Sequence, residues 1–140
     1  MKKVSNLSAF TVLVIFLFVN SFNAKSQTEN LECHKNLLIQ RNADNSIKRI
    51  EATFTHNLTF DDLVQIKYEL QKVGITINYR KIEFDGHDLL LAIECEVVSD
   101  NGGNGSFGVD KLHTLNNKRI GFYCDYSPES ASPFGTGYLN

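Results

Sequence analysis

Alternation of apolar and polar residues marks the first clear element of the chain. Ile50, Ala52 and Phe54 alternate with polar residues at positions 51, 53 and 55. A period of two places the apolar side chains on one face, as in a strand with one buried side. From Ile47 onward the pattern therefore predicts a half-buried β-strand.

A helical period follows, from Thr59 to Gly74. Thr59 is placed to cap the first turn, and Asp62, three residues later, completes a variant of the capping box. Gly74 stands where a left-handed residue commonly ends a helix. The pattern predicts one amphipathic helix over about 59–73. Its apolar face comprises Phe60, Leu63, Ile66, Leu70 and Val73.

Two further strands flank Asp85-Gly86, a dipeptide typical of tight hairpin turns. In the first of them the alternation changes phase near Arg80-Lys81. If this pair together opposes Leu90, every apolar residue falls on one face, and Ile77 then pairs with Ile93. We therefore predict a β-bulge at Arg80-Lys81.

Later segments predict a short strand at 106–109, a short helix or long turn at 111–119, and a last strand. The last strand carries its apolar residues in alternation at Ile120, Phe122, Cys124 and Tyr126. Together these elements predict an α+β fold. We expect a two-layer sandwich in which the helix packs on a mainly antiparallel sheet of four to five strands, within a domain spanning 46–126.

The two ends of this domain are weakly patterned. Residues 27–45 form a weakly structured N-terminal segment, in which Leu37-Leu38-Ile39 suggests a helical turn packed on the domain edge. Residues 127–140 hold both prolines and are expected to form an irregular tail, held to the domain by Phe134 and Tyr138.

The first 26 residues have the order of a secretory signal peptide. Lys2-Lys3 give a basic start, Leu7 to Val19 form an apolar run without a charge, and Ala24-Lys25-Ser26 resembles a cleavage site. As a helix that run reaches only about 20 Å, short of the ~30 Å hydrocarbon layer. We therefore expect cleavage before Gln27, no membrane span afterwards, and a periplasmic or secreted protein.

Charge argues against nucleic acid as a partner. The whole chain has a formal net charge of −2, and removal of Lys2, Lys3 and Lys25 leaves 11 basic against 16 acidic residues, a net charge of −5. A phosphate backbone would be repelled by this balance rather than gathered. We expect an unknown protein or small ligand outside the cytoplasm instead.

Three cysteines lie in a chain bound for a compartment that permits disulfides. If the strands bearing Cys95 and Cys124 are neighbours, both sulfurs face the helix side and could form a bond; the alternative is two buried free thiols. Cys33 is then the unpaired cysteine. The spacing of the cysteines does not fit a zinc site.

The motifs that carry chemistry in other proteins are incomplete in this chain, and we expect no catalytic residue, cofactor or metal. Residues 103–108 match the spacing of a dinucleotide-binding loop, but no helical pattern follows them, so they predict a hairpin loop. Oxygen ligands for calcium near Asp100 do not follow the EF-hand pattern. His87 lies between Asp85 and Asp88, where a solvated turn is the simpler interpretation.

One stretch of the chain is similar to a known kind of domain. It runs Thr59-Phe60-Asp61-Asp62-Leu63-Val64-Gln65-Ile66-Lys67-Tyr68-Glu69-Leu70, with Gly74-Ile75, Tyr79 and the later strand and Gly-rich turn of 89–109. It resembles a small domain of bacterial secreted proteins of unassigned role, also found in the extracytoplasmic C-terminal parts of membrane metallopeptidases of the β-lactam-sensor type. The resemblance implies a fold and an extracytoplasmic setting. It carries no catalytic residue, because the chain has no H-E-x-x-H motif.

The outward face of the predicted sheet is the candidate interaction surface. Leu90 and Ala92 are expected to point there beside Glu94, leaving a face for a partner opposite the helix. The leading hypothesis is an exported, non-catalytic module that binds a protein or a ligand. The alternatives are an inhibitor or immunity-type protein that inserts a hairpin tip (85–88 or 101–105) into a hydrolase, and a small hydrolase.

Overall fold

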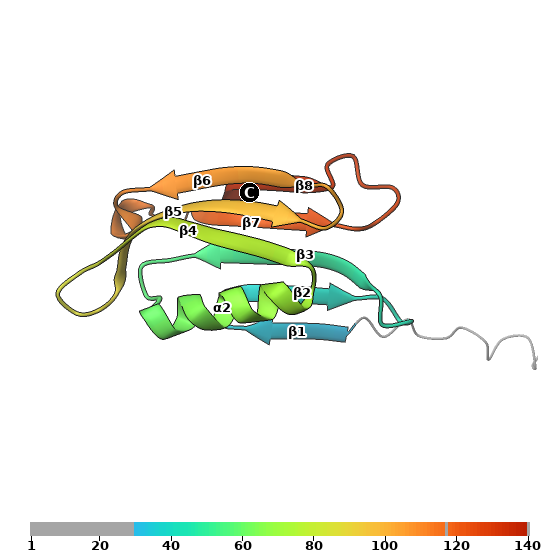
Figure 1. Ribbon diagram of the computed structural model, residues 1–140, viewed down its shortest axis with the longest axis horizontal. Helices are drawn as coiled ribbons and strands as arrows, with labels where there is room; N and C mark the ends of the chain where they lie inside the picture. The colour runs from blue at the N-terminus through green and yellow to red at the C-terminus, as the bar shows by residue number, and fades with distance from the viewer. Residues whose placement is uncertain (1–29, 117, 140) are drawn as a thin grey trace, which may run out of the picture.

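The computed structural model describes residues 30–116 and 118–139, and the signal peptide predicted for residues 1–26 lies outside them (Figure 1). Eight strands, one α-helix and one short 3-10 helix make up the described chain. In chain order they are β1 (Asn30–His34), β2 (Leu37–Arg41), β3 (Ile47–Phe54), α2 (Phe60–Lys72), β4 (Ile75–Phe84), β5 (Leu90–Ser99), β6 (Asn104–Val109), η1 (Leu112–Thr114), β7 (Arg119–Asp125) and β8 (Phe134–Leu139).

The strands form two antiparallel sheets rather than one. A five-stranded sheet has the order β1-β2-β3-β7-β8, and a three-stranded sheet has the order β4-β5-β6. Helix α2 lies beside β4, so that the helix and the small sheet together cover one face of the large sheet (Figure 1). The predicted α+β class with one helix is confirmed, but the expected single sheet of four to five strands is too small.

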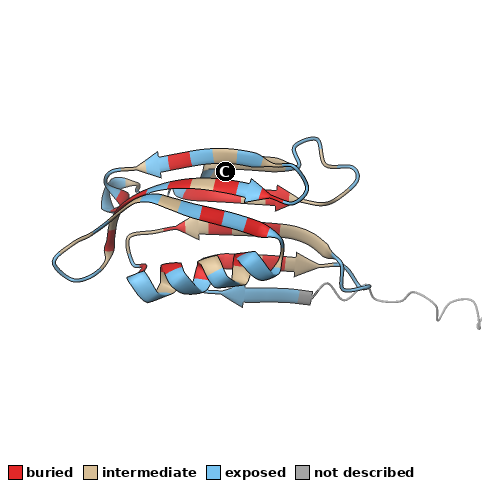
Figure 2. Ribbon diagram, in the orientation of Figure 1, coloured by how far each residue is buried: buried red, intermediate tan, exposed pale blue. Residues whose placement is uncertain are grey.

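A single core fills the space between these layers. The buried residues of β3, β7, β4, β5 and α2 belong to one hydrophobic cluster, and they appear as red bands on these ribbons in Figure 2. Near its centre the Phe54 ring lies 5.4 Å from the Phe107 ring and 6.4 Å from the Tyr79 ring, measured between centroids. The alternating apolar residues of β3 therefore pack against the small sheet as well as against the helix.

Helix α2 begins and ends as its sequence predicts. The Thr59 side chain accepts a hydrogen bond from the Asp62 amide, and the Asp62 carboxylate accepts one from the Thr59 amide, which completes the capping box. Gly74 follows the helix with a φ of 78°, the left-handed conformation that glycine adopts without strain. Leu63, Ile66 and Leu70 are buried, but Phe60 is exposed and is not part of the core face.

The predicted β-bulge is present between β4 and β5, although the partners differ. The register shifts between Tyr79, which pairs with Cys95, and Lys81, which pairs with Glu94. Ile77 pairs with Val97 rather than with Ile93. The difference arises because the connection is a longer loop, in which the Asp85 carboxylate accepts hydrogen bonds from the amides of residues 87 and 89.

A second register shift lies between Leu90 and Ala92. Leu90 pairs with Phe84 and Ala92 with Glu83, so Leu91 is an extra residue that opposes neither. The Leu90 amide donates to the carbonyl of Leu58, which ties β5 to the β3–α2 connection. Leu90 and Ala92 are both fully buried, and the prediction that they lie on an open outward face is wrong.

Both weakly patterned ends contain strands. β1 and β2 form a hairpin, so the helical turn expected at Leu37-Leu38-Ile39 is wrong; Leu37 and Ile39 are buried and Leu38 is not. At the other end, residues 127–133 are irregular but β8 pairs along β7, so only part of the expected tail is irregular. Pairing with β3 and β7 supplies the order that these short segments lack alone.

Candidate functional site

The outer face of the large sheet carries a polar hollow of about 480 Å³ over β3, β7 and β8. The connection between β7 and β8 forms one wall. Antiparallel pairing decides which side chains meet, because Arg49 lies directly opposite Asp125, and Glu51 directly opposite Tyr123. The lining residues are Arg49, Glu51, Tyr123, Asp125, Ser130, Ser132, Gly135, Thr136, Tyr138 and Leu139.

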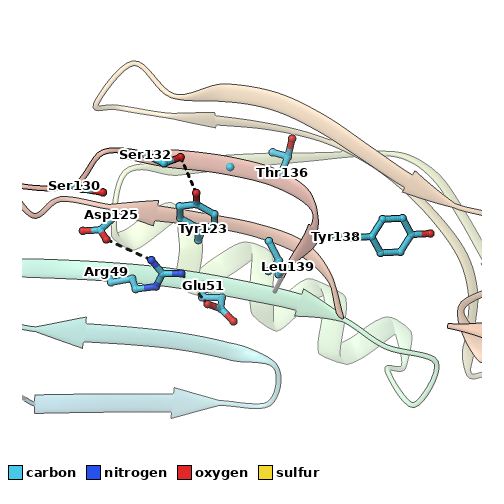
Figure 3. A pocket seen from close by; sticks show the side chains of 10 residues that line it. Arg49, Glu51, Tyr123, Asp125, Ser130, Ser132, Thr136, Tyr138 and Leu139 are labelled. Atoms are coloured by element: carbon cyan, nitrogen blue, oxygen red, sulfur yellow. Dashed lines mark hydrogen bonds and ion pairs between the residues drawn. The ribbon is translucent and has the colours of Figure 1, made fainter. Parts of the chain in front are cut away.

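Arg49 contacts two carboxylates and an aromatic ring in this hollow (Figure 3). Its Nη2 lies 3.1 Å from Glu51 Oε2, its Nη1 lies 3.4 Å from Asp125 Oδ2, and its guanidinium carbon lies 4.5 Å from the centroid of the Tyr123 ring. Arg119 Nη1 approaches the other oxygen of Glu51 at 2.6 Å. Two guanidinium groups and two carboxylates thus alternate on this face, which leaves the cluster without net charge.

The Tyr123 ring is fixed by a glycine and a serine. A Cβ atom on Gly135 would come within 2.6 Å of the ring, so the glycine leaves the space that the ring occupies. The Tyr123 hydroxyl lies 2.8 Å from the Ser132 hydroxyl, across to the wall of the hollow (Figure 3). The ring is therefore held between two strands and the connecting segment.

Hydrogen bonds and a guanidinium group hold Asp125 in its ionised form. Hydrogen bonds from the backbone and side chain of Ser127 lower the pKa of Asp125, and Arg49 lowers it further. A carboxylate held ionised in this way is a poor general acid at neutral pH. The cluster can instead accept and donate hydrogen bonds to a ligand in fixed directions.

A second hollow contains two histidines that the sequence did not connect. His56 Nδ1 lies 2.8 Å from the carbonyl oxygen of Leu90, and its Nε2 lies 3.2 Å from Asp85 Oδ2. The His113 ring packs against His56 with centroids 5.8 Å apart. Asp85 therefore contacts His56 of the β3–α2 connection, whereas His87, its neighbour in sequence, is exposed at the loop tip.

The residues named from the sequence do not come together in one site. Glu94 is exposed on the outer face of the small sheet, while Leu90 and Ala92 are in the core. Cys95 and Cys124 lie on strands of different sheets, so the adjacency on which the disulfide depended is not present. Both are buried free thiols, and Cys33 is an exposed one. Burial raises the pKa of Cys95 to about 12 and that of Cys124 to about 11.

A hairpin connection is present as predicted, but it is shorter than expected, because residues 104–108 belong to β6. Ser99 and Gly103 close it through a backbone hydrogen bond of 2.8 Å, and β6 begins at Asn104 where a dinucleotide site would need a helix. Across residues 30–116 and 118–139, no group of three or more His, Cys, Asp or Glu side chains is placed to hold a metal ion. No helix in the same residues is long and apolar enough to cross a membrane.

The residues of the polar hollow were missed although their strands were predicted. The alternation of β3 and β7 already places Arg49, Glu51, Tyr123 and Asp125 on the faces opposite the apolar ones. The missing information was that the two strands, about 70 residues apart in sequence, are neighbours. The available signal was the pattern of outward positions: both strands carry charged residues of mixed sign there, and one also carries an aromatic residue.

Comparisons with known proteins identify no relative. No family model, curated protein or solved structure matches this chain. The resemblance to extracytoplasmic domains of unassigned role therefore stays a prediction.

Proposed function

We propose that this chain is an exported, non-catalytic binding module that acts in the periplasm or outside the cell. Its binding face is the outer face of the large sheet. The observation that carries this proposal is the half-buried cluster of Arg49, Glu51, Tyr123 and Asp125 within a hollow of about 480 Å³. The proposed export depends on the order of residues in the first 26 positions.

The chemistry of the cluster favours an uncharged polar ligand. Both guanidinium groups already face carboxylates, so an anion would have to displace Glu51 or Asp125 to reach Arg49. Neutral hydroxyl or amide groups can donate to the carboxylates and accept from the guanidinium without breaking these pairs. The hydroxyls of a carbohydrate meet this requirement.

Affinity capture from an extracytoplasmic extract tests the proposal, with bound proteins and small molecules identified by mass spectrometry. Tyr123→Ala removes the ring at the centre of the hollow, and Ser132→Ala removes only the hydroxyl that contacts it. Arg80→Ala, on the outer face of the small sheet, is the matched control. A ligand retained by the wild type and the control but lost from the Tyr123 variant supports the proposal. Equal retention by all variants rejects this face.

An inhibitor or immunity-type role is the second candidate, because the β4–β5 loop extends from the body of the molecule (Figure 1). The loop is ordered by its own hydrogen bonds, from the amides of residues 87 and 89 to Asp85. A preformed loop loses little conformational entropy on entering a cleft. This role predicts a stoichiometric complex with a hydrolase that is weakened by His87→Ala and unaffected by Tyr123→Ala.

A further inference from the structure

β1 is the open edge of the large sheet. At the opposite edge, β8 is covered by β6, where Thr136 Oγ1 donates to the carbonyl oxygen of Ser106 at 3.2 Å. Within the described chain, β2 is the only strand that pairs with β1, and Leu31 to Lys35 are exposed (Figure 1). A row of backbone N–H and C=O groups at such an edge is a template for another strand.

We propose that β1 pairs with β1 of a second copy of this chain, antiparallel, about a two-fold axis that joins two large sheets into one. The turn between β1 and β2 contains two residues, Lys35 and Asn36, and His34 pairs with Leu37 beside it. In a hairpin of this kind the pair next to the turn exchanges backbone hydrogen bonds, and the following pair does not. The backbone groups of Cys33 and Leu31 consequently face the open edge, where a second strand would meet them.

Charge selects one register for this pairing. With Cys33 at the two-fold axis, Glu32 of each copy lies opposite His34 of the other, so that a carboxylate faces an imidazole twice. A shift that places the axis at Glu32 brings two carboxylates together, which is unfavourable. Of these two registers, the Cys33-centred one is favoured, because it keeps the two carboxylates apart.

The side chains at this edge have room for a partner. Glu32 accepts a hydrogen bond from Arg41 Nε at 2.9 Å through one oxygen, and its side chain remains 48% exposed. Lys35 Nζ lies 2.7 Å from Asp62 Oδ2, which anchors the β1–β2 turn to the start of α2. The turn thus holds β1 in place without covering its outer edge.

Cross-linking reports the register directly. Two residues that form a hydrogen-bonded antiparallel pair have Cα atoms about 5.5 Å apart, so Cys33 of one copy lies within reach of Cys33 of the other. A short bis-maleimide applied to the purified mature protein, which is predicted to begin at Gln27, should produce a covalent dimer, because Cys33 is the exposed cysteine and the other two are buried. Cys33→Ser should abolish the cross-link while leaving the mass measured by light scattering at that of a dimer.

A charge exchange tests the pairing without the cysteine. His34→Glu places two carboxylates opposite each other at both positions and should give a monomer, and Glu32→Lys with His34→Glu should restore the dimer. Leu31→Pro removes an N–H group that faces the open edge and should also give a monomer, with an unchanged circular dichroism spectrum. A wild-type monomer, or a dimer that survives both His34→Glu and Leu31→Pro, would overturn the proposal.

Discussion

The outer faces of the two sheets carry the same kinds of side chain in different surroundings. On the large sheet, the side chains of Arg49, Glu51 and Asp125 are 31%, 13% and 21% exposed. On the small sheet, those of Arg80 and Glu96 are 57% and 41% exposed, although their atoms approach to 2.8 Å. Contact distance alone therefore does not distinguish the two faces.

The difference comes from what surrounds each ion pair. The β7–β8 connection forms a wall beside the cluster on the large sheet and restricts its contact with solvent. The Arg80–Glu96 pair has no such wall, and both side chains are exposed to solvent. Water and salt screen exposed charges strongly and partly buried charges less. A surface ion pair thus becomes a shaped site only where other segments restrict its access to solvent.

The largest effect is expected from Leu90, which is buried in the core and not exposed on the outer face of β5. Leu90→Ala should lower the free energy of unfolding by about 2–5 kcal/mol, because it leaves a cavity in the core. Val98→Ala, at an exposed residue of the same strand, is the control and should have a small effect. Urea denaturation measures both. Equal effects would mean that Leu90 is not a core residue.

Glu51 tests whether the large sheet's cluster is stronger than the exposed pair. Glu51→Gln weakens contacts with two guanidinium groups and should lower the free energy of unfolding by about 1.5–3 kcal/mol. Glu96→Gln should cost only about 0.2–1 kcal/mol, since its partner is solvated. The same denaturation experiment in high salt should reduce the second effect more than the first. A Glu51 effect as small as that of Glu96 would remove the distinction between the faces.

Gly135 tests the support beneath Tyr123. Gly135→Ala introduces a methyl group within 2.6 Å of the ring and should destabilise the fold by about 1–3 kcal/mol or displace the ring. Gly86→Ala, where nothing lies within 4 Å, is the matched control. The environment of Tyr123 can be followed by aromatic NMR shifts. Unchanged shifts and unchanged stability would show that the ring does not depend on this glycine.

Acid should weaken the large sheet's cluster through Asp125. Its pKa is lowered in the folded chain, so its contribution to stability is present above the unfolded pKa of about 3.9 and is lost as pH falls through the folded value. Asp125→Asn should therefore make the fall in unfolding free energy between about pH 5 and pH 2 less steep. Ser132→Ala, an uncharged change in the same hollow, should keep the wild-type slope. Parallel slopes for all three proteins would contradict this assignment.

Thiol labelling gives the smallest effect, since it changes no contact of either face. One cysteine, Cys33, should react quickly in the folded chain, and all three should react after unfolding, because Cys95 and Cys124 are buried free thiols with raised pKa values. Counting labelled sites by mass spectrometry checks this. A protein that keeps only one reactive thiol in denaturant contains the disulfide that the sequence left open.

Local patterns determined the elements whose information lies within one segment. Thr59, Asp62 and Gly74 specify both ends of α2 from neighbouring residues, and alternation specifies β3 and the bulge at Arg80-Lys81. These features could be predicted because capping and alternation act within a few residues. β1 and β8 could not, because their order comes from strands that are distant in sequence.

Tertiary structure alone decided where the chemistry of this protein gathers. The sequence determined that Arg49 and Tyr123 point away from the apolar face of their strands, but only the pairing of β3 with β7 brought them together. In the same way, Leu90 and Ala92, expected on an open surface, are both buried, and the register shift at Leu91 between them was not visible in the sequence. The physical reason is that side-chain direction is a local property of a strand, whereas neighbours, register and burial are set by how the whole chain packs.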